Sequence, residues 1–439
     1  MLKKLSIAVA LAATVTSTAF ADDTNYDASV ARSDIQHQID DLKVQLKSLE
    51  KQNDELNKKV TQGLTVPTTK GEIQNFLYSD MHEGIVPFAM MSSSQLAYSL
   101  LKQRDKFSDQ ALIFGGFVEA DAQTWNGSKI ETSTLVNANK ESEGYKYFPT
   151  SGKNIYLTSA KLYMSANLGK YVTAYTYLSG DQDNAPDISK AAVIFGNLSV
   201  SPFYVTVGKL TVPVGTYGGG GPWTSSLSDA YFNISTQSNV SVAYSNADNG
   251  VSTNVTWFQV DDHSSSFSTA LFYKGTLGEL NYGANVGYIY NIAGKLLGLE
   301  NDDGRVGEFN TDLNLNYDIY GLGLGWSTTT NSSATTNNGK AGAWYISADA
   351  APTIWGRSTD FSLAYNGAYN TNDVGDVVAL SGAAMPGYAT NSGVQKQIIA
   401  GISRPVFSDN VLLGLEYAYQ YLYNKQHANT YTLDLSVFF

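Results

Sequence analysis

The chain has 439 residues, 40 acidic against 28 basic side chains, a formal net charge of −12 and no cysteine. This acidic balance argues against a nucleic-acid partner, and the missing cysteines exclude disulfide bonds. Beyond the first 21 residues there is no run of 18 or more apolar residues, so helices that span a membrane are excluded and a closed β-barrel is the remaining way to span one.

The first 21 residues have the organisation of a secretory signal peptide. Lys3 and Lys4 are followed by the apolar stretch "LSIAVALAATVTSTAF" and by the A-x-A site Ala19-Phe20-Ala21. A retained anchor helix is the alternative, but the apolar stretch is shorter than the roughly 20 residues that a span requires. We therefore expect residues 1–21 to be removed and the chain to be exported.

Residues 22–63 contain a heptad pattern. Apolar residues recur at alternating steps of four and three, and Asn53 takes one core position. The proposed seam consists of Ile35, Ile39, Leu42, Leu46, Leu49, Asn53, Leu56 and Val60. A single amphipathic helix is the alternative, but the other positions are polar, which favours a parallel coiled coil between subunits. The mixture of Ile and Leu leaves a dimer and a trimer open.

Residues 64–110 are harder to interpret. The stretch "SSSQLAYSLLKQRDKF" predicts a short amphipathic helix after "MHEGIVPFAMM". The segment could be a periplasmic linker or a small plug in the mouth of a barrel, and the sequence does not decide between them.

From Ala111 to Phe439 the hydrophobic period is two, which is typical of β-strands. The predicted strands are 111–124, 153–168, 171–180, 189–198, 203–211, 237–245, 251–260, 266–275, 279–290, 307–319, 321–330, 341–350, 357–368, 395–404, 411–423 and 429–439. The pattern predicts an all-β transmembrane barrel of about sixteen antiparallel strands. An even number of strands places both ends of the barrel on the periplasmic side.

The predicted connections alternate in length. Short turns at Gly169-Lys170, Ser201-Pro202 and Tyr320-Gly321 alternate with long loops such as 125–152 and 212–236. Short periplasmic turns and long outer loops are typical of outer-membrane barrels, so we expect contact with outer-membrane lipid.

The loop at 212–236 is the candidate for a constriction. Gly219 lies in a glycine run that allows close packing of the backbone inside a barrel, and Tyr217 and Trp223 could stack on a solute. The alternative is a loop that caps the barrel from outside.

The chain ends in "NTYTLDLSVFF", with Tyr431, Leu433, Leu435, Val437 and Phe439 on one register. A polar and an apolar face on the last strand, closed by a terminal Phe, resembles the C-terminal signature of outer-membrane proteins. We interpret Tyr431, Leu435, Val437 and Phe439 as a signal for the barrel-assembly machinery.

Strand parity predicts which charged side chains face the interior. The predicted pore-lining residues are Glu119, Asp121, Lys161, Lys209, Asp312, Asp318, Asp360, Glu416 and Asp434. Acids outnumber bases in this set, which favours cationic or neutral polar solutes. The alternative is that these carboxylates pair with bases across the interior and only stiffen the wall.

The sequence offers little for catalysis. The four histidines, at 37, 82, 263 and 427, fall in different segments without metal-ligand spacing. The acidic stretch "SGDQDNAPD" lacks the glycine and distal glutamate of a calcium loop, and the glycines at 218–221 are not followed by Lys-Ser or Lys-Thr. We therefore expect neither an enzyme nor a cofactor.

The order of a coiled coil, a linker, "FGGFVEADAQTW", "NIYLTSAKLYMSANLGKYVTAYTYLSGD" and "FGNLSVSPFYVTVGKLTVPVGTYGGGGPWTSSLSDAYF" resembles the LbtU-type siderophore porin family. The resemblance implies a sixteen-strand barrel that takes up ferric siderophore, and it assigns no ligand-binding residue. An energy-driven receptor would need about 22 strands and a globular plug, so passive or facilitated transport is expected. A general diffusion porin for small hydrophilic solutes and a structural or adhesive protein are the alternatives.

Overall fold

The computed structural model describes residues 40, 43–45, 47, 51, 75–78, 86–134, 147, 148, 150–234, 236–246, 249–260, 265–293, 305–333, 336, 338–372, 388–390 and 392–439. The chain divides into two compact units, residues 1–63 and residues 64–439. In the first unit the described residues are helical, and Lys43 forms an exposed ion pair with Asp40 at 3.3 Å.

The predicted signal peptide lies outside the described residues, and so does the whole predicted heptad seam. The seam residues are Ile35, Ile39, Leu42, Leu46, Leu49, Asn53, Leu56 and Val60. The coiled coil therefore stays a prediction. Among the residues that are described, no helix combines the length and the hydropathy needed to cross a bilayer.

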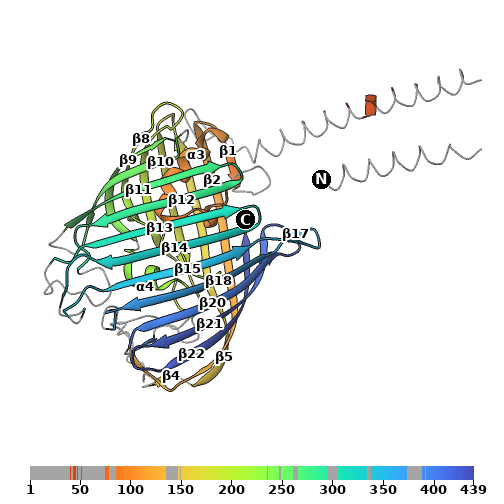
Figure 1. Cartoon of the computed structure of the whole chain (residues 1–439). Helices are drawn as coiled ribbons and strands as arrows, with labels where there is room; N and C mark the ends of the chain where they lie inside the picture. The colour runs from red at the N-terminus through yellow and green to blue at the C-terminus, as the bar shows by residue number, and fades with distance from the viewer. Residues whose placement is uncertain are drawn as a thin grey trace, which may run out of the picture. The chain divides into compact units, whose positions relative to one another are not determined.

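All sixteen predicted strands of the second unit are present, with ends shifted by up to three residues (Figure 1). They are β2 Gln110–Gly127, β5 Ser151–Leu168, β6 Val172–Gly180, β7 Asp187–Gly196, β8 Phe203–Thr211, β9 Thr236–Asn246, β10 Val251–Gln259, β11 Ser265–Leu277, β12 Leu280–Ile289, β13 Glu308–Tyr317, β14 Tyr320–Thr329, β15 Gly342–Ala350, β18 Asp360–Tyr369, β20 Val394–Pro405, β21 Val411–Leu422 and β22 His427–Phe438.

These strands form one closed antiparallel barrel. Each is paired with its neighbours in chain order, and β2 pairs with both β5 and β22. At the closing seam, Phe117 lies opposite Phe438 and Asp121 lies opposite Asp434. Closure satisfies the backbone hydrogen bonds of both edge strands, which the interior of a bilayer requires.

The two faces of the wall are the reverse of those in a water-soluble sheet. Along β22, Thr432, Asp434 and Ser436 point into the barrel and are buried, whereas Leu433 and Leu435 point outward and are exposed. The other strands repeat this pattern. Exposed aliphatic side chains on the outer face are Val207, Val242, Val255, Leu271, Val286, Leu324, Ile346, Leu363, Ile398, Leu415, Leu433 and Leu435.

Exposed aromatic side chains lie at both ends of this apolar band. One group lies where the strands join through short turns, hereafter the short-turn end, and the other lies at the long-loop end. The first includes Tyr171, Phe195, Phe203, Tyr317 and Tyr320, and the second includes Trp257, Phe267, Trp326, Trp344 and Tyr431. An apolar band between two aromatic girdles matches the outer surface of a membrane barrel.

The turn between β13 and β14 differs from the prediction. Tyr317 pairs with Tyr320, so the turn consists of Asp318 and Ile319, and Tyr320 and Gly321 belong to β14. Asp318 adopts a positive φ of 51°, which aspartate tolerates better than most residues.

Five short strands lie outside the barrel wall proper. β16 Thr353–Ile354 and β17 Arg357–Ser358 form a small hairpin at the short-turn end, and β3 Ile130–Thr134 pairs with β4 Tyr147–Phe148 and with β19 Tyr388–Thr390 at the long-loop end. They lie in three of the connections, β2–β5, β15–β18 and β18–β20, and do not alter the closure of the barrel.

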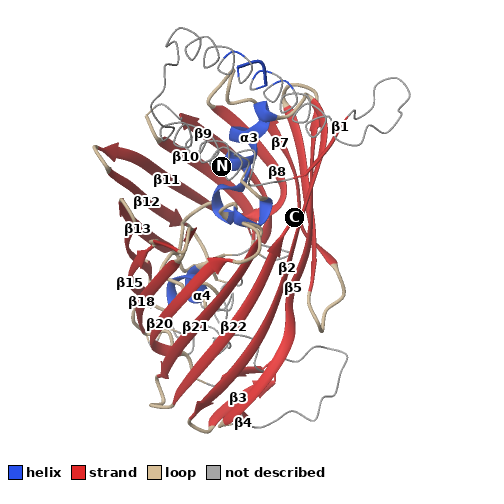
Figure 2. Cartoon of the chain, turned by 90° about the vertical axis from the view of Figure 1, so that its right-hand side faces the viewer, coloured by secondary structure: helices blue, strands red, loops and turns tan. Residues whose placement is uncertain are grey.

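A further strand, β1 Asn75–Tyr78, pairs in parallel with the first residues of β2. The chain then forms short helices: η2 Phe88–Met90, η3 Ser93–Gln95, α3 Leu96–Gln103 and η4 Arg104–Lys106. Figure 2 shows α3 near the end of the barrel where β1 lies.

Residues 86–107, which we call the plug segment, pack against the inward face of the wall. The ring of Phe88 stacks on Tyr163 at 5.8 Å, and Leu96, Leu100 and Leu101 join the same buried cluster. The cluster also contains inward side chains of β2, β5, β6, β7, β8, β9 and β22. The described part of this segment therefore occupies part of the barrel interior.

Candidate functional site

The long connection between β8 and β9 folds into the barrel. It runs along the inner wall and includes the short helix α4 Leu227–Phe232, whose first turn is capped by the Ser226 hydroxyl. Its Val212, Val214, Leu227, Tyr231 and Phe232 are buried with inward residues of the wall. We call residues 212–234 the inner loop. The structure thus favours the constriction over the external cap.

Polar groups of the wall hold the inner loop along its length. The amide of Asn254 donates to the Pro213 carbonyl at 2.9 Å, and the amide of Gln397 donates to the Ser225 carbonyl at 2.8 Å. Because Asn254 is on β10 and Gln397 is on β20, the loop crosses a large part of the inner circumference.

Tyr217 is locked between the inner loop and β13. Its hydroxyl donates to Glu308 Oε1 at 2.8 Å, and the Asn310 amide approaches the same hydroxyl at 3.2 Å. Burial and the nearby Glu308 raise the pKa of Tyr217 well above its usual value, so the hydroxyl stays protonated. With 6% of its surface exposed, Tyr217 is not available to stack on a solute, and that part of the prediction is wrong.

Gly219 fits a position that other residues would fill badly. Its φ is +81°, and a Cβ there would lie 2.2 Å from ring atoms of Tyr345. The Asn366 amide donates to the Gly219 carbonyl at 2.9 Å, while its oxygen accepts from the Leu227 backbone at 3.1 Å. The close approach of loop and wall explains the glycine run.

Glu416, on β21, anchors the middle of the inner loop. It accepts the backbone N–H of Trp223 at 2.9 Å and that of Thr224 at 3.1 Å, together with the Thr224 hydroxyl. The Trp223 ring packs over Gly414 and remains half-buried. Glu416 is therefore a fixing point for the constriction as well as an inward carboxylate.

The structure places most of the predicted pore-lining residues on the inward register. Glu119, Asp121, Lys161, Asp312, Glu416 and Asp434 lie within the wall, and Asp360 shares their register at the short-turn end of β18. Among the described residues, the salt bridges are Lys43 with Asp40 and Arg104 with Asp109. The inward carboxylates thus form no salt bridge there, contrary to the alternative in which they pair across the interior.

Two predicted pore-lining residues lie elsewhere. Lys209 shares the outward register of Val207, with Ser238 and Ala191 beside it, and its Nζ donates to the Ile188 carbonyl at 3.2 Å. A positive φ at Gly208 precedes it. Asp318 is exposed in the turn described above. Asp318 lies in a turn outside the strand pattern, whereas Lys209 keeps the regular alternation of β8, whose inward residues include Tyr204, Thr206 and Leu210.

Four further charged residues on the inward face were missed. They are Lys190, Lys274, Glu308 and Asp349. The inward neighbours of Lys190 and Lys274 are apolar, namely Ala192 and Ile194 on β7 and Ala270 and Phe272 on β11. These neighbours lie in the part of the wall near the plug segment, so alternation of polar and apolar residues does not mark the inward face there.

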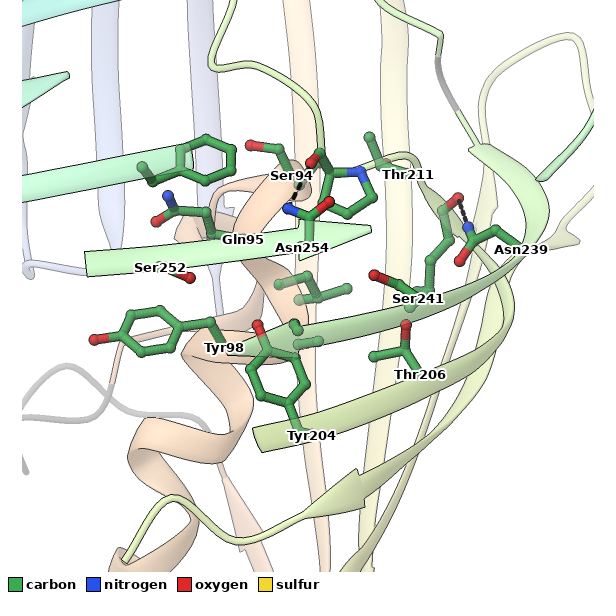
Figure 3. Close-up of a pocket in the computed structure, with 17 residues that line it drawn as sticks. Ser94, Gln95, Tyr98, Tyr204, Thr206, Thr211, Asn239, Ser241, Ser252 and Asn254 are labelled. Atoms are coloured by element: carbon green, nitrogen blue, oxygen red, sulfur yellow. Dashed lines mark hydrogen bonds between the residues drawn. The ribbon is translucent and has the colours of Figure 1, made fainter. Parts of the chain in front are cut away.

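A small pocket separates the plug segment from β8, β9 and β10 (Figure 3). Gln95 and Tyr98 lie on one side of it, and Tyr204, Ser241 and Asn254 lie on the other. Its volume is about 30 Å³, the space of a water molecule. The plug segment therefore nearly seals this side of the barrel.

A larger cavity of about 800 Å³ adjoins it at the short-turn end. It lies between α3 and the short-turn ends of β9, β10, β11, β12 and β13. Within the described residues, no group of three or more His, Asp or Glu side chains is placed to hold a metal ion. The lining of this cavity mixes polar side chains with the rings of Tyr98, Phe272, Tyr273 and Tyr282.

A sequence family described as "Protein of unknown function (DUF3573)" matches residues 57–299, more than half of the chain. The chain belongs to this family. The DUF3573 match covers the plug segment, the inner loop and strands β2 to β12, so it includes both segments that enter the barrel. No curated protein matches the sequence significantly.

Solved structures resemble this DUF3573 protein in fold. OmpF of Salmonella typhi in complex with daunomycin has a TM-score of 0.50 at 13% identity, covering 76% of this chain and 99% of that one. An OmpT loop-deletion mutant, an outer membrane protein of Vibrio cholerae, has 0.48 at 10% identity and covers 76% and 100%. An anion-selective porin from Comamonas acidovorans has 0.48 at 12% identity and covers 75% and 100%. The OmpF likeness shows the same barrel fold.

Proposed function

We propose that the protein is an outer-membrane porin through which small hydrophilic solutes pass without an energy source. The observation that carries this proposal is the reversed burial of the wall, with charged and amide side chains inside and an apolar band between aromatic girdles outside. A closed barrel with those two faces is suited to lipid outside and an aqueous path inside.

The segments inside the barrel limit the size of the solute. The plug segment fills one side of the short-turn end, and the inner loop narrows the middle through its bonds to Glu416 and Glu308. The cavity of about 800 Å³ at the short-turn end is comparable in size to a ligand pocket. Small solutes are therefore expected to pass.

The short-turn end would face the periplasm, and residues 22–63 would extend there as a coiled coil that joins subunits. The outer band would contact outer-membrane lipid, and the barrel-assembly machinery would bind the last strand. The supporting observation for the last point is the exposure of Tyr431 and Leu435 on β22 and of Phe439 directly after it.

Reconstitution tests the proposal. The purified full chain in liposomes should cause swelling with a neutral pentose or hexose, and in planar bilayers it should give stepwise conductance. A preparation that is folded by its heat-modifiable gel mobility but conducts nothing would contradict the proposal and favour a structural or adhesive role.

Uptake of ferric siderophore is the finer proposal, and it is supported by the resemblance of residues 114–232 to LbtU-type siderophore porins. Cells with and without the protein should differ in uptake of labelled ferric siderophore under iron limitation. If iron uptake is unchanged while sugar permeability falls, a general diffusion porin is the better description.

A further inference from the structure

The cavity at the short-turn end is bounded by two elements that are distant in sequence. Gln95, Tyr98 and Lys102 contribute from the plug segment, and the wall contributes the short-turn ends of β9 to β13. We call this space the basic vestibule, because both of its charged lining residues, Lys102 and Lys274, are cationic.

Among the residues that the structure describes, no carboxylate compensates the charge of the basic vestibule. Among the described lining residues there is no Asp or Glu, and neither lysine belongs to a salt bridge of the described residues. Lys274 Nζ donates to the neutral Gln95 Oε1 at 3.2 Å, and Lys102 is near enough to repel it electrostatically. The adjoining carboxylates Glu279 and Asp318 belong to exposed turns and not to the lining.

Two inward acids, Glu308 and Asp312, are on β13, on the long-loop side of the lining residues Asn314 and Asn316, and most of the others lie in another sector of the wall. Glu119, Glu416 and Asp434 belong to β2, β21 and β22, away from the strands that line the vestibule. Like charges that face a confined polar space raise the local concentration of counter-ions. The vestibule is thus a local cationic site in an acidic protein.

Neutral donors complete the lining. Lys274, Gly283 and Asn314 lie side by side on the inward face of β11, β12 and β13, followed one step along the strands by Asn281 and Asn316. A Cβ added at Gly283 would meet no heavy atom closer than the Tyr273 carbonyl, at 3.8 Å. This glycine leaves a hollow beside the ammonium group, bordered by amides that can donate hydrogen bonds.

We propose that the basic vestibule binds small anionic solutes that carry carboxylate or phosphate groups, and that it makes the channel selective for anions. This inference rests on the proposed porin function and names its solute class. Anion selectivity is the opposite of the cation preference that the excess of acids in the whole wall suggests. We expect the charges that border the free space to decide the selectivity.

Gly283 offers a variant that adds charge without removing any existing contact. Gly283→Glu places a carboxylate beside Lys274, and Gly283→Gln is the matched control with the same bulk and no charge. Lys274→Gln removes the cation, and Lys209→Gln removes a lysine from the outer face.

The full chain is reconstituted in planar bilayers under a KCl gradient at low ionic strength, where screening is weak. The wild type should be anion-selective by reversal potential, and Gly283→Glu and Lys274→Gln should each lower the anion-to-cation permeability ratio by about tenfold, the low end of the effect of charged clefts. Citrate should block the wild type and lose potency against both variants. Gly283→Gln and Lys209→Gln should keep the wild-type ratio.

The outcomes separate this inference from the proposed function. A conducting wild type that prefers potassium, or a conducting Gly283→Glu with an unchanged ratio and unchanged citrate block, would overturn the vestibule as an anion site and leave the porin function standing. A folded wild type without conductance would overturn both.

Discussion

A substitution at Glu416 tests whether this one side chain holds the inner loop in place. Glu416→Gln keeps the size of the side chain but replaces one acceptor oxygen with a donor that cannot accept from the loop. We expect the inner loop to lose about 1–3 kcal/mol of anchoring and single-channel conductance to rise. Glu119→Gln is the control, since its carboxylate is also inward but makes none of these loop contacts. Equal conductance in both variants would contradict the anchoring role.

Asp434 tests the electrostatics of the closing seam. It lies directly opposite Asp121, both are buried at 0% and 4% exposure, and each has one carboxylate oxygen without a hydrogen-bond partner. Two carboxylates directly opposite each other repel where both are ionised, so Asp434→Asn should stabilise the barrel at alkaline pH by about 0.2–1 kcal/mol. The temperature at which the folded gel mobility is lost should rise, whereas Glu279→Gln in an exposed turn should leave it unchanged. A lower temperature for Asp434→Asn would show that the pair is stabilising.

Alternation along a strand predicts which of its side chains face the interior, but it does not predict how a loop packs inside the barrel. Asp121, Glu416 and Asp434 were predicted correctly as inward because their strands alternate cleanly. Lys209 was assigned to the wrong face although β8 alternates regularly, and Tyr217 is enclosed by a wall that lies about 90 residues further along the chain. The enclosure of Tyr217 leaves no periodic signal, because it depends on tertiary packing.

Among the elements, the plug segment is held at its end by Arg104. Its guanidinium binds Asp109 at 3.0 Å and also donates to the Gly169 carbonyl in the β5–β6 turn. Arg104→Gln should weaken this attachment by about 1–3 kcal/mol and increase the open fraction of the channel in bilayer recordings. Lys170→Gln, in the same turn, is the control. Wild-type gating in a folded Arg104→Gln protein would show that the apolar cluster alone retains the plug.

The last strand owes part of its docking to its final residue. Phe439 exchanges backbone hydrogen bonds with Gly116, and its ring occupies the space that a Cβ at Gly116 would need. Deleting Phe439 should impair assembly more than the conductance of barrels that do assemble, as measured by outer-membrane levels against single-channel recordings. Normal levels of the truncated chain in the membrane would count against an assembly role.

At the level of elements, the sequence predicted the strands of the wall but not how the plug segment packs inside the barrel. The sixteen strands follow from alternation, which a two-sided wall imposes on every strand. The plug segment was ambiguous because an amphipathic helix can bury its apolar stripe in any apolar environment. Its docking partners, such as Tyr163 and Tyr175, lie on strands that are more than 50 residues away.

For the molecule as a whole, the heptad pattern of residues 22–63 predicts a coiled coil and, with it, the oligomeric state. Asn53→Leu, or deletion of residues 33–62, should change the oligomer without unfolding the barrel, because a polar core residue restricts the number of strands in a coiled coil. Crosslinking and light scattering would detect the change, with heat-modifiable mobility as the control for the barrel. A trimer that persists after the deletion would assign assembly to the barrel wall.

The pairing of β1 has a practical consequence for handling the protein. β22 covers one edge of β2 only as far as Gly116, and β1 takes the same edge from Ala111 to Phe114. Two residues added after Phe439 would already reach Phe114 and compete with β1 for its backbone partners. An affinity tag fused to the C-terminus is therefore not neutral here, and a tag inserted in a connection at the long-loop end would leave that edge undisturbed.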